Sequence, residues 1–161
     1  MDQIFQNAPA ALAHISGGAE SSVGGTVAFY PRETGTLVVA NIYGLPFEAE
    51  RSCASRIFGF HIHEGGACTP PAFEDAGGHF NPEGCEHPQH AGDLPPLFGC
   101  RGEAYLAVLT DRFSVSDVVG RTVVIHDAPI LQRSPRGTPE PGSGAASFGR
   151  CSGDGVPILL A

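Results

Sequence analysis

The sequence predicts an all-β protein, an antiparallel β-sandwich or barrel with two long loops. Three observations support this fold class: the apolar stretches are short, no long stretch shows helical periodicity, and 22 glycines and 14 prolines are scattered along the 161 residues. No internal repeat or linker divides the chain. We therefore expect one domain over residues 1–161, which is long enough to bury a hydrophobic core.

Strands are predicted where apolar, β-branched and aromatic residues gather between turn signals. In the first half of the chain they span 10–15, 24–30, 35–43 and 56–64. In the second half they span 104–110 and 120–126, and the segment 147–158 supplies the last strand or strands. The segments 65–96 and 127–147 are predicted as long loops. A long loop inside a compact domain usually has a functional cause.

The composition excludes some partners. The formal net charge of −8, with arginine as the only cationic residue type besides histidine, argues against nucleic acid as a partner. No apolar run reaches the length of a membrane helix, so no membrane association is expected. The first residues lack the basic region of a signal peptide, and we therefore expect a cytoplasmic location, although the cysteine content also suits an oxidising compartment.

Six of the seven histidines are spaced as metal ligands. His61 and His63 are two residues apart on a predicted strand, so both side chains lie on one face of the strand. His126, at the end of another strand, can supply a third ligand and His79 a fourth. His79 also begins a second group. The members of this second group lie close together in the sequence: His79, His87, His90 and Asp93. Seven ligands complete two four-coordinate sites only if one imidazole, that of His79, is shared.

Alternative interpretations exist for single residues. Any one histidine is more often a surface or core residue than a ligand, but six such placements would have to coincide. His14 has no partner in the pattern, and we interpret it as structural or exposed. A cupin-like or hydrolytic zinc enzyme is disfavoured. Cupins carry a glutamate ligand a few residues after His-x-His, and a zinc ion with four protein ligands leaves no position for a water nucleophile.

These motifs resemble the copper,zinc superoxide dismutases, and bacterial members most closely. The resemblance covers about residues 24–151. Its motifs are Cys68 five residues after His63, then Asp-Ala-Gly-Gly-His-Phe-Asn-Pro, a short zinc subloop, and His-Ala-Gly-Asp-Leu-Pro-Pro-Leu. The resemblance implies a Greek-key β-barrel of about eight strands. It also implies a copper ion held by His61, His63, His79 and His126, and a zinc ion held by His79, His87, His90 and Asp93.

The activity implied by the resemblance is the disproportionation of superoxide to dioxygen and hydrogen peroxide. Copper would cycle between its two oxidation states, and His79 would be the catalytic residue that detaches from copper, takes up a proton and delivers it. Zinc has no accessible second state and would keep the site organised. Superoxide is the implied substrate, and a second copy of the chain and a copper chaperone are the further partners considered.

The chain departs from the family pattern in its C-terminal segment, 151–161, and at two positions that bear on the site. The family has a substrate-guiding arginine three residues before its last cysteine, where this chain has Phe148, and Arg150 adjoins the cysteine instead. Arg133 or Arg136 is a candidate replacement. The family also carries an aspartate four residues after the last copper ligand, where this chain has Ile130. These departures predict a slower enzyme and favour, as the alternative function, a non-enzymatic copper- or zinc-binding protein on the same fold.

The five cysteines predict at least one disulfide bond. Cys68 and Cys151 match the family disulfide, and the resemblance implies that they are paired. Cys53 with Cys85 is a candidate second bridge. A competing hypothesis makes Cys85, two residues before His87, a thiolate near zinc.

Overall fold

The structure is a computed structural model that describes residues 8–17, 21–49, 56–69 and 74–126, and the backbone of 149–151 and 159–160. The strands are β1 (Ala11–Ser16), β2 (Gly24–Arg32), β3 (Gly35–Tyr43), β4 (Ile57–His63), β5 (Leu97–Phe98), β6 (Ala104–Thr110), β7 (Thr122–His126), β8 (Gly149–Cys151) and β9 (Leu159–Leu160). A 3₁₀-helix, η1 (Glu74–Ala76), and a short α-helix, α1 (Val115–Val118), complete the described elements.

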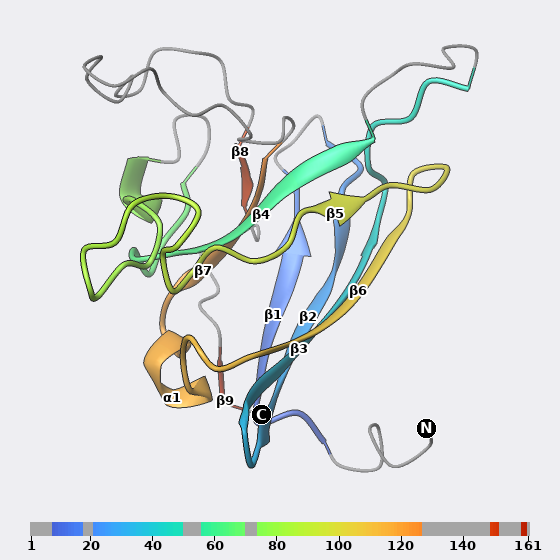
Figure 1. Cartoon of the computed structure of the whole chain (residues 1–161). Coiled ribbons are helices and arrows are strands. Elements are labelled where there is room, and N and C mark those ends of the chain that lie inside the picture. The colour runs from blue at the N-terminus through green and yellow to red at the C-terminus, as the bar shows by residue number, and fades with distance from the viewer. Residues whose placement is uncertain are drawn as a thin grey trace.

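Two antiparallel sheets form the molecule, one in the order β6-β3-β2-β1-β9 and the other in the order β5-β4-β7-β8 (Figure 1). After β3 the chain crosses to the second sheet for β4 and β5, and then returns as β6 beside β3. Crossings of this kind between two sheets are typical of Greek-key sandwiches. The predicted all-β fold class is confirmed.

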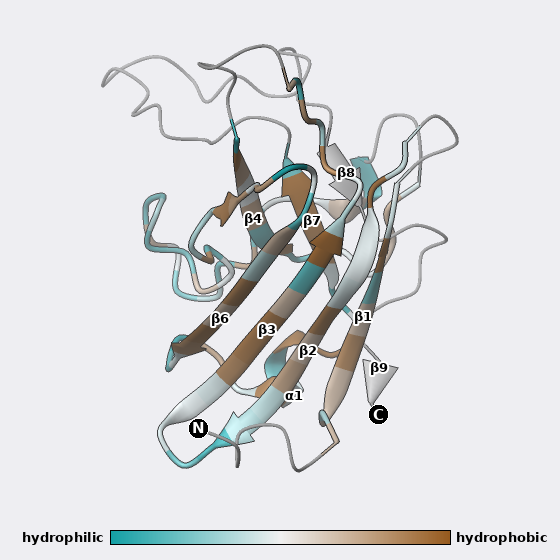
Figure 2. Cartoon of the chain, turned by 90° about the vertical axis from the view of Figure 1, so that its right-hand side faces the viewer, coloured by the Kyte–Doolittle hydropathy of each residue, from teal (hydrophilic) through white to brown (hydrophobic). Residues whose placement is uncertain are grey.

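The core lies between the two sheets. Along β3 every second side chain is buried, and on β2 the buried side chains include Val27 and Phe29, which are two residues apart. Figure 2 shows the hydrophobic middle of both strands in brown. Val27, Phe29 and Val38 are completely buried, and they pack with Phe60 and Ile62 of the opposite sheet in one hydrophobic cluster. Since each of these side chains removes a large apolar surface from water, this cluster supplies most of the driving force for folding.

The strand β4 is buried on both faces, as is its neighbour β7. All residues of β4 except Ile57 are buried. The loop after β4 returns along its free edge, where the Ile62 N–H donates to the Gly92 carbonyl at 2.9 Å and the Leu94 N–H donates to the Phe60 carbonyl at 3.2 Å. The loop is therefore bound to the strand by backbone hydrogen bonds.

The six strands predicted over residues 10–126 are all present, with ends shifted by up to two residues. Two described strands, β8 and β9, lie in or next to the segment 147–158, and the second predicted loop lies outside the described residues. The sequence did not predict β5, η1 and α1, which have only two to four residues each. His14 is exposed on β1, as expected. Among the described residues, no helix is long and apolar enough to span a membrane.

Candidate metal centre

Three of the seven predicted ligands come from paired strands. His61 and His63 lie on β4 and His126 ends β7, and all three are buried. The strands pair so that Gly59 faces His126 and His61 faces Val124. This register brings Nε2 of His63 within 3.3 Å of Nε2 of His126. The pairing of β4 with β7 therefore sets the positions of these imidazoles.

The loop after β4 adds the imidazole of His79. A backbone bridge pairs His63 with His79, and next to it the Glu64 N–H donates to the Gly78 carbonyl at 2.9 Å. The Gly78 N–H in turn donates to the Glu64 carboxylate at 3.2 Å. The ring of His79 stacks on that of His61, with 4.0 Å between the ring centroids. The strand and the loop together complete the first group, whose ligand atoms all lie within 4.8 Å of one another: His61, His63, His79 and His126.

The second group is organised around the carboxylate of Asp93, which is held beside β4 by a backbone bridge to His61. One oxygen, Oδ1, lies 2.7 Å from Nδ1 of His79. The other, Oδ2, lies 3.0 Å from Nδ1 of His87 and 3.2 Å from Nδ1 of His90. The three imidazoles and the carboxylate again lie within 4.8 Å of one another. His79 belongs to both groups, and its Nδ1 faces the second one.

Hydrogen bonding fixes which nitrogen of His63 can bind a metal. Its Nδ1 lies 2.9 Å from the Gly77 carbonyl, which can only accept a hydrogen bond, so Nδ1 carries the proton and Nε2 keeps its lone pair. The Nδ1 atoms of His61 and His126 are buried and have no hydrogen-bond partner among the described residues. Buried polar atoms normally have a partner, and a bound metal ion would supply one for His61.

The three strand histidines of the first group are neutral at neutral pH. Burial, reinforced by the neighbouring imidazoles, lowers the pKa of His61 to about 2 and of His126 to about 3, and burial lowers that of His63 to about 4. Burial raises the pKa of Asp93, but the hydrogen bond from His79 and the nearby imidazoles outweigh it and bring the value to about 2. Neutral imidazoles and an ionised carboxylate are the protonation states that bind metal ions.

The donor distances fit a four-coordinate ion. Ligands at the usual Zn–N distance in a tetrahedral site lie about 3.3 Å apart. In the second group the distance between Nδ1 of His79 and Nδ1 of His90 is 3.4 Å, and those from Asp93 Oδ2 to His87 and His90 are 3.0 and 3.2 Å. Three nitrogens and one carboxylate are a closed zinc-type donor set, whereas four imidazoles also suit copper.

The fold and this site define a β-sandwich protein with two adjoining histidine-rich metal groups that share one residue. A family model described as copper/zinc superoxide dismutase matches residues 23–149. The chain belongs to this family.

Three relatives illustrate the similarity. The chain is 35% identical over 125 residues to superoxide dismutase [Cu-Zn] 2 of Aquifex aeolicus, covering 68% of this chain and 69% of the relative. It is 32% identical over 123 residues to superoxide dismutase [Cu-Zn] of Schizosaccharomyces pombe, covering 66% of this chain and 72% of the relative. It is 56% identical over 84 residues to the superoxide dismutase-like protein YojM of Bacillus subtilis, covering 43% of each chain.

All seven predicted ligands come together in the structure, whereas the side chains of the predicted guidance residues lie outside the described part of the chain. Arg133, Arg136 and Phe148 lie outside the described residues, as does Ile130, and only the backbone of Arg150 is described. The role of the Gly77 carbonyl was not predicted from the sequence. The pair Gly77-Gly78 before His79 was a signal for a turn, and in the structure Gly77 has a φ of +67°, which residues with a side chain rarely adopt.

The cysteine predictions need one correction. Cys85 is a free thiol, so the candidate bridge between Cys53 and Cys85 is wrong. The side chain of Asn81 holds the backbone of Cys85 from both sides, at 2.9 Å each, and Cys85 is in neither metal group. The hypothesis that its thiolate lies near zinc therefore has no support in the geometry.

The predicted Cys68–Cys151 disulfide stays a prediction, but the geometry favours it. Cys68 is disulfide-bonded and Cys100 is free like Cys85, which leaves Cys53 or Cys151 as the partner. Cys68 packs against Val124, and Val124 faces Cys151 across the β7–β8 pair.

Proposed function

We propose that this protein converts two superoxide anions and two protons into one dioxygen and one hydrogen peroxide. Membership of the copper/zinc superoxide dismutase family supports the reaction. The single observation that carries it in this chain is the position of His79, whose imidazole belongs to a four-histidine group and to a group with three histidines and a carboxylate. The two donor sets that share this ring differ, and such a pair suits a redox-active ion beside a structural ion.

In this proposal copper is held by the first group and zinc by the second. The copper ligands are His61, His63, His79 and His126, and the zinc ligands are His79, His87, His90 and Asp93. Copper supplies the change between two oxidation states that lets one superoxide lose an electron and the next gain one, whereas zinc has no redox chemistry. The histidines of β4 and β7 keep the reacting site at a fixed place in the sandwich.

The protein's own contribution to the chemistry is proton handling at His79. Its Nδ1 lies against Asp93, so Nε2 is the nitrogen that can take up a proton and deliver it to reduced superoxide. Asp93 fixes the plane of the ring, because its carboxylate contacts His87 and His90 at the same time. The side chain of His79 is 14% exposed, which gives the ring access to protons from solvent.

Reduced activity is part of the proposal, since Phe148 stands where the family has its guiding arginine. A chain with a net charge of −8 repels an anionic substrate unless a local positive field opposes the average. We propose that Arg133, Arg136 or Arg150 supplies this field. The same departure keeps a second candidate function open, that of a copper- and zinc-binding protein without turnover.

Turnover of superoxide by the metal-loaded protein, measured with a chelator that removes unbound copper, distinguishes the two functions. We expect the protein to accelerate the loss of superoxide and to lose this activity when His61 is replaced by Ala. Replacing the guiding arginine by Ala should slow turnover and flatten its decrease with ionic strength. A metal-loaded protein that does not accelerate the loss of superoxide under these conditions would establish the binding function instead. The cytoplasmic location, a second copy of the chain and a copper chaperone stay predictions.

A further inference from the structure

Three backbone carbonyls of the loop that carries the second metal group converge on one side chain from elsewhere in the chain. Nη1 of Arg112 donates to the carbonyls of Pro88 and His90 at 3.2 Å each, and to that of Asp93 at 3.3 Å. His90 and Asp93 are themselves members of the second group, and Pro88 follows a third member, His87. The guanidinium therefore contacts the backbone at or next to every member of the group except His79.

A cation stabilises converging carbonyls. Each carbonyl oxygen carries a partial negative charge, so three that lie around one donor repel each other, and a positive charge on that donor reduces the repulsion. Nη1 has two hydrogens for three acceptors, and the distances of 3.2–3.3 Å are at the long end for such bonds. Each contact is therefore weak, but the full charge of the guanidinium acts on all three carbonyls at once.

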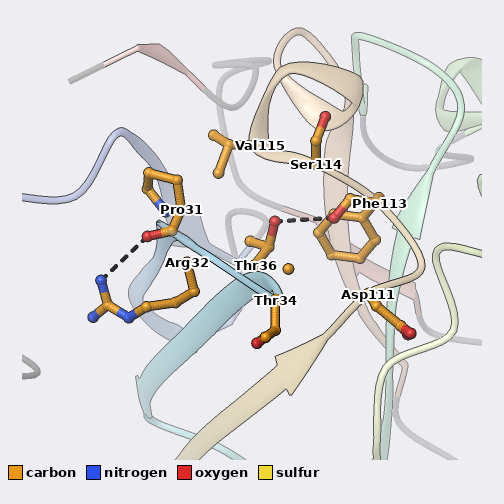
Figure 3. A pocket seen from close by; sticks show the side chains of 9 residues that line it. Pro31, Arg32, Thr34, Thr36, Asp111, Phe113, Ser114 and Val115 are labelled. Carbon is orange, nitrogen blue, oxygen red and sulfur yellow. Dashed lines mark hydrogen bonds between the residues drawn. The ribbon is translucent and has the colours of Figure 1, made fainter.

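Arg112 reaches the loop from a firmly held base between β6 and α1. Its own N–H lies 3.3 Å from the Thr110 hydroxyl oxygen, which accepts. The next residue, Phe113, is buried in the core, and its carbonyl accepts a hydrogen bond of 2.9 Å from the Thr36 hydroxyl (Figure 3). The base also includes Ser114, whose side chain and N–H both bind the Asp117 carboxylate. The loop is thus held against a part of the sandwich that lies 19–24 residues away in the sequence.

We propose that Arg112 is a positioning residue for the second metal group: its guanidinium holds the three carbonyls together and so keeps His87, His90 and Asp93 in the arrangement that binds zinc. The inference rests on the proposed assignment of zinc to this group. It does not extend to the first group, because His61, His63 and His126 are placed by the pairing of β4 with β7. Replacing Arg112 should therefore lower the affinity for zinc and leave the affinity for copper nearly unchanged.

The test measures the affinities of the metal-free protein for Zn²⁺ and for Cu²⁺ by competition with a chromophoric chelator. The variants are Arg112→Ala, Arg112→Lys and the control Arg32→Ala. Arg32 lies at the end of β2, where it donates to the Pro31 carbonyl and lies over the ring of Tyr30. Its replacement changes the net charge equally and leaves the three carbonyl contacts of Arg112 in place. The absorption spectrum of Co²⁺ bound in place of zinc gives a second readout, of ligand geometry.

We expect Arg112→Ala to weaken Zn²⁺ binding about 10- to 100-fold, the range found for residues that orient metal ligands. Copper binding should stay within about twofold, because the strand histidines are oriented by contacts that do not involve Arg112. Arg112→Lys should recover part of the zinc affinity, since one ammonium keeps the charge but has a different donor geometry. The Co²⁺ spectrum of Arg112→Ala should change, and that of Arg32→Ala should not.

Zinc affinity of Arg112→Ala within twofold of the native protein, or an equal loss in Arg32→Ala, would overturn the inference while leaving the proposed function intact. An equal loss of copper and zinc affinity would also overturn it, because Arg112 would then support the fold rather than the group. A native protein that binds no zinc at all would instead contradict the metal assignment and, with it, this role of Arg112.

Discussion

The two metal groups contain similar side chains but are built in different ways. His61, His63 and His126 of the first group stand on paired strands, where the register of β4 and β7 sets their positions. The second group includes three residues of one loop, His87, His90 and Asp93. There the Asp93 carboxylate contacts both histidines, and Arg112 contacts the backbone of the loop. The comparison teaches that similar ligands can be prearranged either by a sheet or by side-chain contacts. Where side-chain contacts place the ligands, the arrangement depends more on single residues than it does in a sheet.

The largest effect is expected at Asp93, the centre of the loop-borne group. Replacing Asp93 by Ala removes a ligand and the contacts that align three imidazoles, so zinc affinity should fall more than the roughly 100-fold seen for residues outside the ligand set. Copper affinity should fall much less. Glu86→Ala is the matched control, since Glu86 is an exposed acid of the same loop. Equal losses for the two metals would show that the groups are not built independently.

In the metal-free protein the strand histidines of the first group and Asp93 of the second should lose their contributions to stability in different pH ranges. The folded pKa values of His61, His63 and His126 are lowered, so their contribution is complete above pH 6.5 and is lost as the pH falls toward about 2–4. At pH 5 each of these histidines should lower the free energy of unfolding by about 2 kcal/mol relative to its value at neutral pH. The contribution of Asp93, whose pKa is lowered to about 2, is lost only below pH 3.8.

Urea unfolding between pH 7 and pH 3 measures this dependence. Replacing His61 by Asn, which does not titrate in this range, should reduce the loss of stability between pH 7 and pH 5. A free energy of unfolding that is constant from pH 7 to pH 5 would mean that the strand histidines are not held neutral by burial.

A smaller effect on stability and copper binding is expected at Gly77. This glycine lies in the loop, but its carbonyl contacts His63 on β4. An alanine there would require a φ of +67° and would place its Cβ 2.8 Å from Cγ of Glu64. The backbone strain alone costs about 1–2 kcal/mol. Gly84→Ala is the control, because Gly84 has a φ of +65° but open space around it. Thermal unfolding should show a larger loss for Gly77→Ala, together with weaker copper binding, since the Gly77 carbonyl orients His63.

The residues of the two metal groups could be predicted from the sequence, but the contacts that hold these residues in place could not. His-x-His on an apolar strand, and three histidines with an aspartate in one loop, carry their chemistry in residue type and spacing, so the seven residues that the structure brings together could all be predicted. The role of Arg112 could not, because its acceptors are backbone carbonyls 19–24 residues away, and no side-chain pattern marks them. Short elements such as β5 and α1 were missed because two to four residues show no periodicity.

The central claim is that His79 serves both groups, and the metal affinities of three single variants test it most directly. His61→Ala should weaken copper binding and His87→Ala should weaken zinc binding, each leaving the other metal within about tenfold. His79→Ala should weaken both metals, and the native protein should hold one copper and one zinc per chain by elemental analysis. If His79→Ala weakens only one of the two metals, or if the native chain holds a single ion, His79 is not shared and the proposed centre is wrong.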